Sequence, residues 1–132
     1  MRIAIYFLLT YALAIWTTGI AENSSYQYGQ VIEDLRGAGG GVSVTWKTST
    51  EEYSGSYVDA GNLLNLFINT RLENLGKAYG ELLKNLGIEP NPNIKSNKLR
   101  FLDYLGSSGW EIVWVRELES KTIYEFKRPI VE

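Results

Sequence analysis

The chain contains neither cysteine nor histidine among its 132 residues. Without cysteine there can be no disulfide, no thiolate nucleophile or metal ligand, and no lipidated leader cysteine. Without histidine there can be no Ser-His-Asp triad and no imidazole metal site. The sequence therefore predicts a domain held together by packing alone. No motif assigns it a metal site, a cofactor or a catalytic residue.

An excess of charge of one sign is also missing. The formal net charge is −2, from 13 basic and 15 acidic residues. Removing the N-terminal segment that carries Arg2 leaves 12 basic residues against 15 acidic ones, a net charge of −3. The only basic groupings are Lys95 with Lys98 and Arg100, and the pair Lys127–Arg128. Nucleic acids and anionic lipid surfaces bind larger basic clusters, so neither is expected as the main partner.

The first 21 residues have the composition of an export signal. Arg2 is followed by nineteen uncharged residues that end at Ala21, and Gly19 and Ala21 place small residues before a cut ahead of Glu22. Residues 1–21 are therefore predicted to be a signal peptide. The alternatives are an uncleaved membrane anchor, which would be the chain's only membrane contact, and a buried core helix.

Either of the first two readings carries everything after Glu22 across a membrane. The domain is then periplasmic, secreted or outward-facing on an anchor. Because an exported domain without disulfides fits a prokaryotic exterior better than a eukaryotic secretory pathway, a prokaryotic source is favoured.

Two strands are predicted at the start of the domain. Residues 26–35 are rich in aromatic and branched side chains, and residues 42–49 alternate strictly, with Val42, Val44 and Trp46 on one face. The glycine-rich stretch 36–41 between them predicts a hairpin loop. It does not predict a phosphate loop, since no Gly-Lys-Ser/Thr follows and the next element is a strand.

A long helix is predicted over residues 60–86, after a polar connection at 50–56 and a cap at Asp59. Gly87 is expected to end it. Gly76 and Gly80, four residues apart, are expected to let another backbone approach one side closely. The predicted apolar stripe comprises Leu64, Ile68, Leu72, Leu75, Tyr79, Leu82 and Leu86.

A shorter helix is predicted from a cap at Ser96 to Leu105, with Leu99, Leu102 and Leu105 facing inward and Gly106 as its stop at positive φ. Two more strands follow, at 110–118 and 122–128, joined by a tight turn at 119–121.

The strand at 110–118 is apolar on both sides. Regular alternation points Trp110, Ile112 and Trp114 one way and Val113 and Val115 the other. This pattern predicts a central strand covered on both faces, either by the long helix or by another chain. We therefore expect self-association or the docking of an envelope protein through an apolar face.

The C-terminal third resembles the domain-of-unknown-function family 4177. That family has a helix ending in Leu-Gly, then Gly-Trp-Glu opening a strand, and a last strand ending in Phe-Lys-Arg-Pro. The matching positions here are Gly106, Gly109, Trp110, Glu111, Phe126, Lys127, Arg128 and Pro129. The long helix at 60–86 has no counterpart in the family. The resemblance implies a fold and a structural role for these residues, and it implies no activity.

The predicted fold is a single small α+β domain over residues 22–132 with the order β-β-α-α-β-β. One long and one short helix pack on an antiparallel four-stranded sheet, and the N-terminal hydrophobic segment precedes it as a signal or anchor helix.

An enzyme without histidine and cysteine would depend on paired carboxylates, or on Tyr, Lys and Ser in unusual settings. The candidate carboxylate pairs are Glu33 with Asp34, Glu51 with Glu52, and Glu117 with Glu119. Glu33 and Asp34 are neighbours on a strand and should point to opposite faces. The expected function is a non-catalytic binding or assembly module of the envelope or exterior. The alternatives are a carboxylate-dependent hydrolase and a carbohydrate-binding module that uses sheet aromatics.

Overall fold

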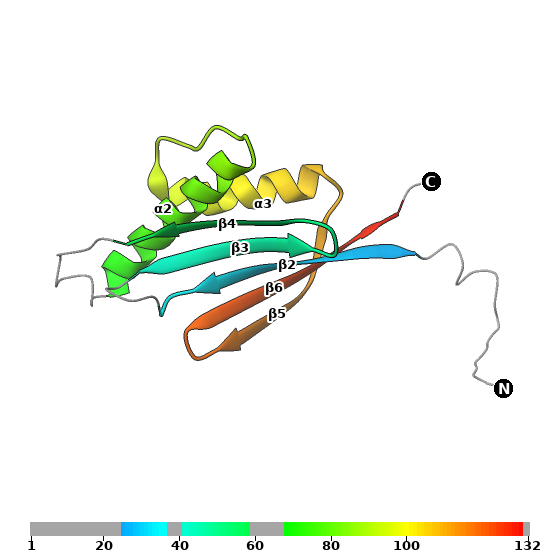
Figure 1. Ribbon diagram of the computed structural model, residues 1–132, viewed down its shortest axis with the longest axis horizontal. Coiled ribbons are helices and arrows are strands. Elements are labelled where there is room, and N and C mark those ends of the chain that lie inside the picture. Colours follow the sequence, from blue (N-terminus) through cyan, green and yellow to red (C-terminus); the bar gives the residue numbers. More distant parts are fainter. Residues whose placement is uncertain (1–24, 37–40, 59–67, 131–132) are drawn as a thin grey trace. The chain divides into compact units, whose positions relative to one another are not determined.

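A computed structural model describes residues 25–36, 41–58 and 68–130 (Figure 1). Four predicted features lie outside the described residues: the signal or anchor at 1–21, the glycine loop at 37–40, the cap at Asp59, and residues 60–67 of the long helix. Residues 28–128 form one unit. The terminal segments form a second, in which the Ile130 amide donates to the Ser25 carbonyl at 3.1 Å.

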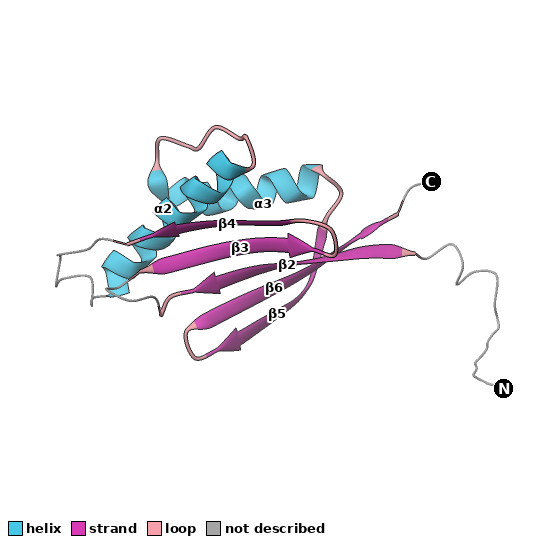
Figure 2. Ribbon diagram, viewed as in Figure 1, coloured by secondary structure: helices cyan, strands magenta, loops and turns pink. Residues whose placement is uncertain are grey.

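Five antiparallel strands make one sheet, in the order β4-β3-β2-β6-β5. The first two, β2 (Tyr26–Asp34) and β3 (Val42–Thr48), form the predicted hairpin, with Val31 opposite Trp46. The last two, β5 (Glu111–Leu118) and β6 (Lys121–Pro129), form the second predicted hairpin. Because β6 lies beside β2, the C-terminal hairpin extends the sheet laid down by the N-terminal one (Figure 2).

The prediction of a four-stranded sheet was wrong. The stretch taken for a polar connection contains a fifth strand, β4 (Glu52–Tyr57), which pairs antiparallel with β3. Its inward positions are Tyr53, Gly55 and Tyr57, and its outward positions are polar, so its hydrophobic signal is weak. A Cβ on Gly55 would fall on the backbone of the long helix at Ala78 and Leu82, so this strand and the helix approach closely because position 55 has no side chain.

The long helix, α2 (Ile68–Asn85), packs on β4 and β3. Leu75, Tyr79 and Leu82 of the predicted stripe are buried, whereas Leu72 is 56% exposed. The close approach expected at Gly76 is confirmed, since a Cβ there would lie 2.6 Å from the Ile94 carbonyl oxygen.

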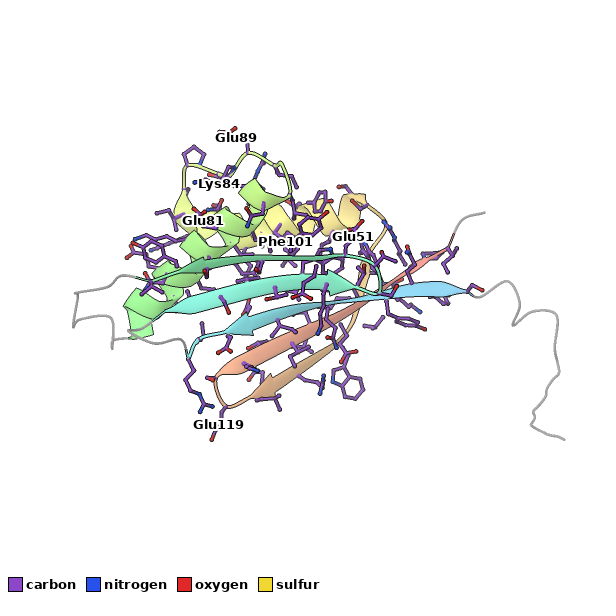
Figure 3. The ribbon with its side chains drawn as sticks, in the orientation of Figure 1. Glu51, Glu81, Lys84, Glu89, Phe101 and Glu119 are labelled. Carbon is purple, nitrogen blue, oxygen red and sulfur yellow. The ribbon has the colours of Figure 1, made fainter. Side chains whose placement is uncertain are left out.

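The short helix, α3 (Asn97–Ser107), follows a 3-10 turn, η3 (Ile94–Ser96). Its inward face was predicted only in part, because Leu105 is buried as expected but the rest of the buried row is Asn97 and Phe101. Leu99 is 64% exposed, and Leu102 is only partly buried. Figure 3 shows Phe101 between the helices and the sheet. Ser96 occupies the predicted N-cap position, but its side chain makes no capping hydrogen bond.

Both helices end in the same backbone motif. At the end of α2, Gly87 has a φ of 79° and the Ile88 amide donates to the Leu83 carbonyl. At the end of α3, Gly109 has a φ of 91° and the Trp110 amide donates to the Leu105 carbonyl. In this pattern the chain exits the helix through one residue in the left-handed region, where glycine is favoured. The prediction that Gly106 takes this role was wrong, because α3 continues through Gly106.

The core centres on Trp46 of β3. Its ring meets Trp110 edge-on at 5.0 Å, Phe126 at 5.8 Å and Phe101 at 6.2 Å between ring centroids. Edge-to-face pairs of this kind add to the stabilisation from area burial. The short helix α3, the strand β6 and the corner at Trp110 are thereby joined around the Trp46 side chain.

Candidate interaction surface

The strand β5 forms one edge of the sheet, and the helices do not cover it. The prediction of a central strand covered on both sides was wrong, since among the described strands β5 lies at the end of the sheet order and pairs with β6 alone. In Figure 1 the helices lie towards β4, and the β5–β6 hairpin lies at the other side of the sheet. Every residue of β5 is exposed, and its large apolar side chains are 46% to 62% accessible. They are Ile112, Val113, Trp114, Val115 and Leu118.

A β-bulge changes which of these side chains share a face. The register with β6 shifts between Ile112 and Trp114. As a result Ile112 and Val115 lie opposite Phe126 and Tyr124, on the face that the helices cover elsewhere, here called the helix face. The regular alternation predicted from the sequence placed Ile112 and Val115 on opposite faces, which was wrong because a bulge inserts one extra residue.

The residues on the other face of β5 belong to the uncovered side of the sheet, here called the open face. Trp114 lies opposite Glu125, and Arg116 opposite Ile123. The Arg116 Nε donates to the Glu125 carboxylate at 3.1 Å. Apolar and charged side chains therefore share this face.

The opposite edge of the sheet differs in chemistry. The exposed residues of β4 are Glu52, Ser54 and Ser56, all polar, and α2 packs on this strand. Polar side chains and a covering helix are two of the devices that protect an edge strand from pairing with another chain. Of the two edges, β5 is the one that combines an unpaired backbone with apolar side chains.

The tip of the β5–β6 hairpin is attached to the end of β2. The Leu35 amide donates to the Ser120 carbonyl at 2.9 Å, and the Arg36 Nε donates to the Ser120 hydroxyl at 2.9 Å. The same guanidinium pairs with Glu119 at 2.6 Å. The backbone bond continues the pairing of β6 with β2 to the end of the hairpin, and the exposed Arg36 contacts add little to it.

The residues that carry the family resemblance form the base of this hairpin. Trp110 is buried against the core, and the Arg128 guanidinium lies over its ring at 4.5 Å and donates to the Ser108 carbonyl at 3.0 Å. Phe126 is buried, and Glu111 lies opposite Lys127 across the two strands. Pro129 is the last residue of β6. These contacts position the start of β5. The family membership itself stays a prediction.

A polar cluster lies under the helices, on the inner face of the sheet. Glu33 of β2 is only 5% exposed and accepts a 2.5 Å hydrogen bond from the Tyr79 hydroxyl of α2. It also pairs with the Lys98 ammonium of α3 at 2.9 Å, and Lys98 donates to the Tyr124 hydroxyl of β6 at 2.6 Å. These hydrogen bonds and the ion pair offset the free-energy cost of removing the Glu33 carboxylate from water. The cluster therefore connects both helices to the sheet.

Two groups of the cluster hold their protons more tightly than usual. Burial raises the pKa of Tyr79 well above its ordinary 10.0, and the adjacent Glu33 charge acts in the same direction. Burial by itself would lower the pKa of Lys98, but hydrogen bonds to Tyr124 and Glu33 and the Glu33 charge together raise it above 10.5. Neither group is thus primed as a base or a nucleophile at neutral pH.

A groove of about 460 Å³ runs along the outer side of α3. Asp103 is the one carboxylate among the residues that line it, so it does not present the carboxylate pair that a hydrolase of this composition needs. Of the predicted pairs, Glu33 is buried beneath the helices while Asp34 accepts a hydrogen bond from the Arg36 amide. Glu51, Glu52, Glu117 and Glu119 are exposed.

Within residues 25–36, 41–58 and 68–130, no three acidic side chains gather where they could hold a metal ion. The exposed aromatic residues of the same ranges are Tyr28 on β2 and Trp114 on β5. Because β6 lies between these strands, their backbones are separated by two strand spacings, about 10 Å, across the sheet.

The sequence predicted the apolar character of β5 but not its position at the edge of the sheet, which leaves its side chains exposed. The position of a strand within a sheet depends on which other strands it pairs with, and this is not written in its own residues. The polar cluster was also missed, since Glu33, Tyr79 and Lys98 come from three distant segments. The only available signal was one acidic residue at an inward position of β2.

No protein-family model, curated protein or solved structure matches this chain. None of the helices in the described ranges combines the length and the apolar character needed to span a bilayer.

Proposed function

We propose that this chain is a non-catalytic binding or assembly module and that the β5 edge is its binding surface. The observation that carries the proposal is the combination on β5 of an unpaired strand edge with five large apolar side chains that are about half exposed. Contiguous exposed apolar surface on a soluble domain marks an interaction site. The β5 edge is therefore expected to be covered when the protein works.

The mode of binding follows from the geometry of an edge strand. An extended segment that adds to β5 would gain main-chain hydrogen bonds along the edge, and pockets for its side chains on either face. Ile112 and Val115 would supply apolar contact on the helix face, and Trp114 would supply it on the open face. The pairing of β6 with β2 supports this, because an edge already ordered within a sheet loses less entropy on binding.

The compartment is proposed from residues 1–21 alone. If they are a cleaved signal, the exported protein begins at Glu22, and mass spectrometry of the protein recovered outside the cytoplasm measures this directly. A chain that retains Met1 and fractionates with membranes would identify an anchor. A chain that retains Met1 and stays in the cytoplasm would remove the export proposal.

The binding proposal is tested by placing a photoreactive phenylalanine derivative at Val113 in the full chain, expressed in cells of the source organism. Ser56, an exposed residue on the opposite edge strand, is the matched control. Irradiation should give a discrete cross-linked species from position 113 and none from position 56. If neither position gives an adduct, or both give the same smear of products, β5 is not a binding surface.

A further inference from the structure

We propose that the strand that covers β5 is the β5 of a second copy, in an antiparallel arrangement in which Glu111 of one copy faces Arg116 of the other. This inference rests on the proposed function, since it names the partner of the same surface. It is carried by a self-complementary pattern of charges and faces within β5.

Two charges of opposite sign, Glu111 and Arg116, stand at matching distances from a point between Val113 and Trp114. If Glu111 is laid opposite Arg116 of a second antiparallel β5, Ile112 falls opposite Val115, and the two-fold axis passes between Val113 and Trp114. The operation then repeats both pairs on the other side of the axis. Opposite charges facing each other across strands are favourable, and so are branched apolar pairs.

The bulge makes this register possible. In a regular strand, residues separated by an odd number point to opposite faces, and a perpendicular two-fold axis would then oppose side chains that point away from each other. Because the register with β6 shifts between Ile112 and Trp114, Ile112 and Val115 share the helix face. Glu111, opposite Lys127, and Arg116, opposite Ile123, both belong to the open face. Arg116 bonds Glu125 of its own chain through Nε at 3.1 Å, so the contact with Glu111 of the other copy would fall to the rest of its guanidinium group.

Other registers are less favourable. An axis through Arg116 or through Glu117 would place like charges directly opposite each other, which is destabilising. Pairing of β5 with the β4 edge of another copy would be heterologous and would grow into an open chain of subunits. That pairing would also oppose apolar side chains to Glu52, Ser54 and Ser56.

The contact is small. A stable dimer of standard size buries about 800 Å² on each partner, and one strand of eight residues provides less than that. We therefore expect a dimer with a dissociation constant in the micromolar range, with two five-stranded sheets joined into one.

Cysteine cross-linking tests the register, since the natural chain has no cysteine. A mixture of the Ile112→Cys and Val115→Cys variants should oxidise to a disulfide-linked heterodimer, because facing residues bring their Cα atoms within the roughly 7 Å that a disulfide requires. Each variant alone should cross-link several-fold less, since residue 112 and its symmetry mate would be offset by about 10 Å along the strands. The matched control is a mixture of Ile112→Cys with Leu118→Cys, which lie on different faces.

A second measurement concerns the charge pair. In sedimentation across about 1–300 μM, Glu111→Lys should weaken dimerisation by about fivefold or more. Arg116→Glu also breaks the bond to Glu125 within the chain, so the double variant is compared with Arg116→Glu alone and should recover dimerisation relative to it. Equal cross-linking in the two mixtures and the two single variants, no recovery in the double variant, a strict monomer, or assemblies that grow beyond a dimer would each overturn the proposal.

The outcome separates this inference from the proposed function. A photo-adduct from position 113 with twice the mass of the chain agrees with self-pairing. An adduct of any other mass overturns self-pairing while β5 remains a binding surface, and the absence of an adduct removes both.

Discussion

The Tyr79 hydroxyl, in the middle of α2, donates a 2.5 Å hydrogen bond to the buried carboxylate of Glu33 on β2. The bond joins the helix layer to the centre of the sheet across 46 residues of sequence. A hydrogen bond to a charged group contributes about 1.5–3 kcal/mol, and a buried carboxylate that loses one donor keeps the cost of its desolvation.

The Tyr79→Phe variant should therefore lower the free energy of unfolding by about 1.5–3 kcal/mol, measured by urea denaturation. The matched control is Tyr57→Phe, because the Tyr57 hydroxyl is contacted by the Lys77 ammonium only at 3.4 Å. The control should change stability by less than about 0.5 kcal/mol. Equal effects of the two substitutions would show that the Tyr79–Glu33 hydrogen bond contributes no more to the free energy of unfolding than the Tyr57 contact.

The same cluster predicts a loss of stability in alkali. The pKa of Tyr79 and that of Lys98 are both raised in the folded state, so the native protein binds more protons than the unfolded chain above their ordinary values of 10.0 and 10.5. Stability from these groups is complete below about pH 10 and falls as the pH rises through the folded pKa values. Denaturation at a series of pH values between 7 and 11.5 measures this slope.

The Tyr79→Phe variant supplies the comparison for the pH series. It lacks one of the two groups, so its stability should fall less steeply above pH 10 than that of the natural protein. Parallel curves for the two proteins would assign the alkaline slope to groups outside the cluster.

Two tryptophans near the same strand should behave in opposite ways. Trp110→Ala should cost about 3–5 kcal/mol, because the ring is 7% exposed and packs edge-on against Trp46. Trp114→Ala, at a ring that is 62% exposed, should stay within about 0.5 kcal/mol when measured at submicromolar concentration, where the monomer prevails. An unchanged melting curve for Trp110→Ala would remove that ring from the core.

Two glycines give a similar contrast. Gly55→Ala should destabilise by about 1–3 kcal/mol, since its Cβ would meet the backbone of α2. Gly106→Ala should stabilise by about 0.5–1 kcal/mol, because the residue is helical and nothing lies within 4 Å of its Cβ position. Thermal melts of both variants measure this. A destabilised Gly106→Ala would restore Gly106 as the residue at positive φ.

Several elements could be predicted because their signals are local. The alternation of Val42, Val44 and Trp46 specified β3 and its buried face, and Gly87 marked the end of α2. The second hairpin was also found, with its turn at residues 119–120. Period, glycine and turn chemistry act over a few residues, so the chain displays them directly.

Other elements depended on contacts with distant segments. The strand β4 is polar outside and has glycine at its centre, so its identity as a strand follows from pairing with β3 and from the approach of α2. The inward row of α3 was mistaken because Leu99 and Phe101 are both apolar, and the surface that α3 meets selects Phe101.

The sequence by itself determined an α+β chain without thiolate or imidazole chemistry, and it determined that a strand apolar on both sides lies within residues 110–118. Only the tertiary structure decided that this strand lies at the edge of the sheet, uncovered, and that a bulge aligns Ile112 with Val115. The physical reason is that the spacing of apolar residues within a segment identifies a strand and its two faces. Which strands lie beside it is decided by the burial of apolar surface contributed by distant segments.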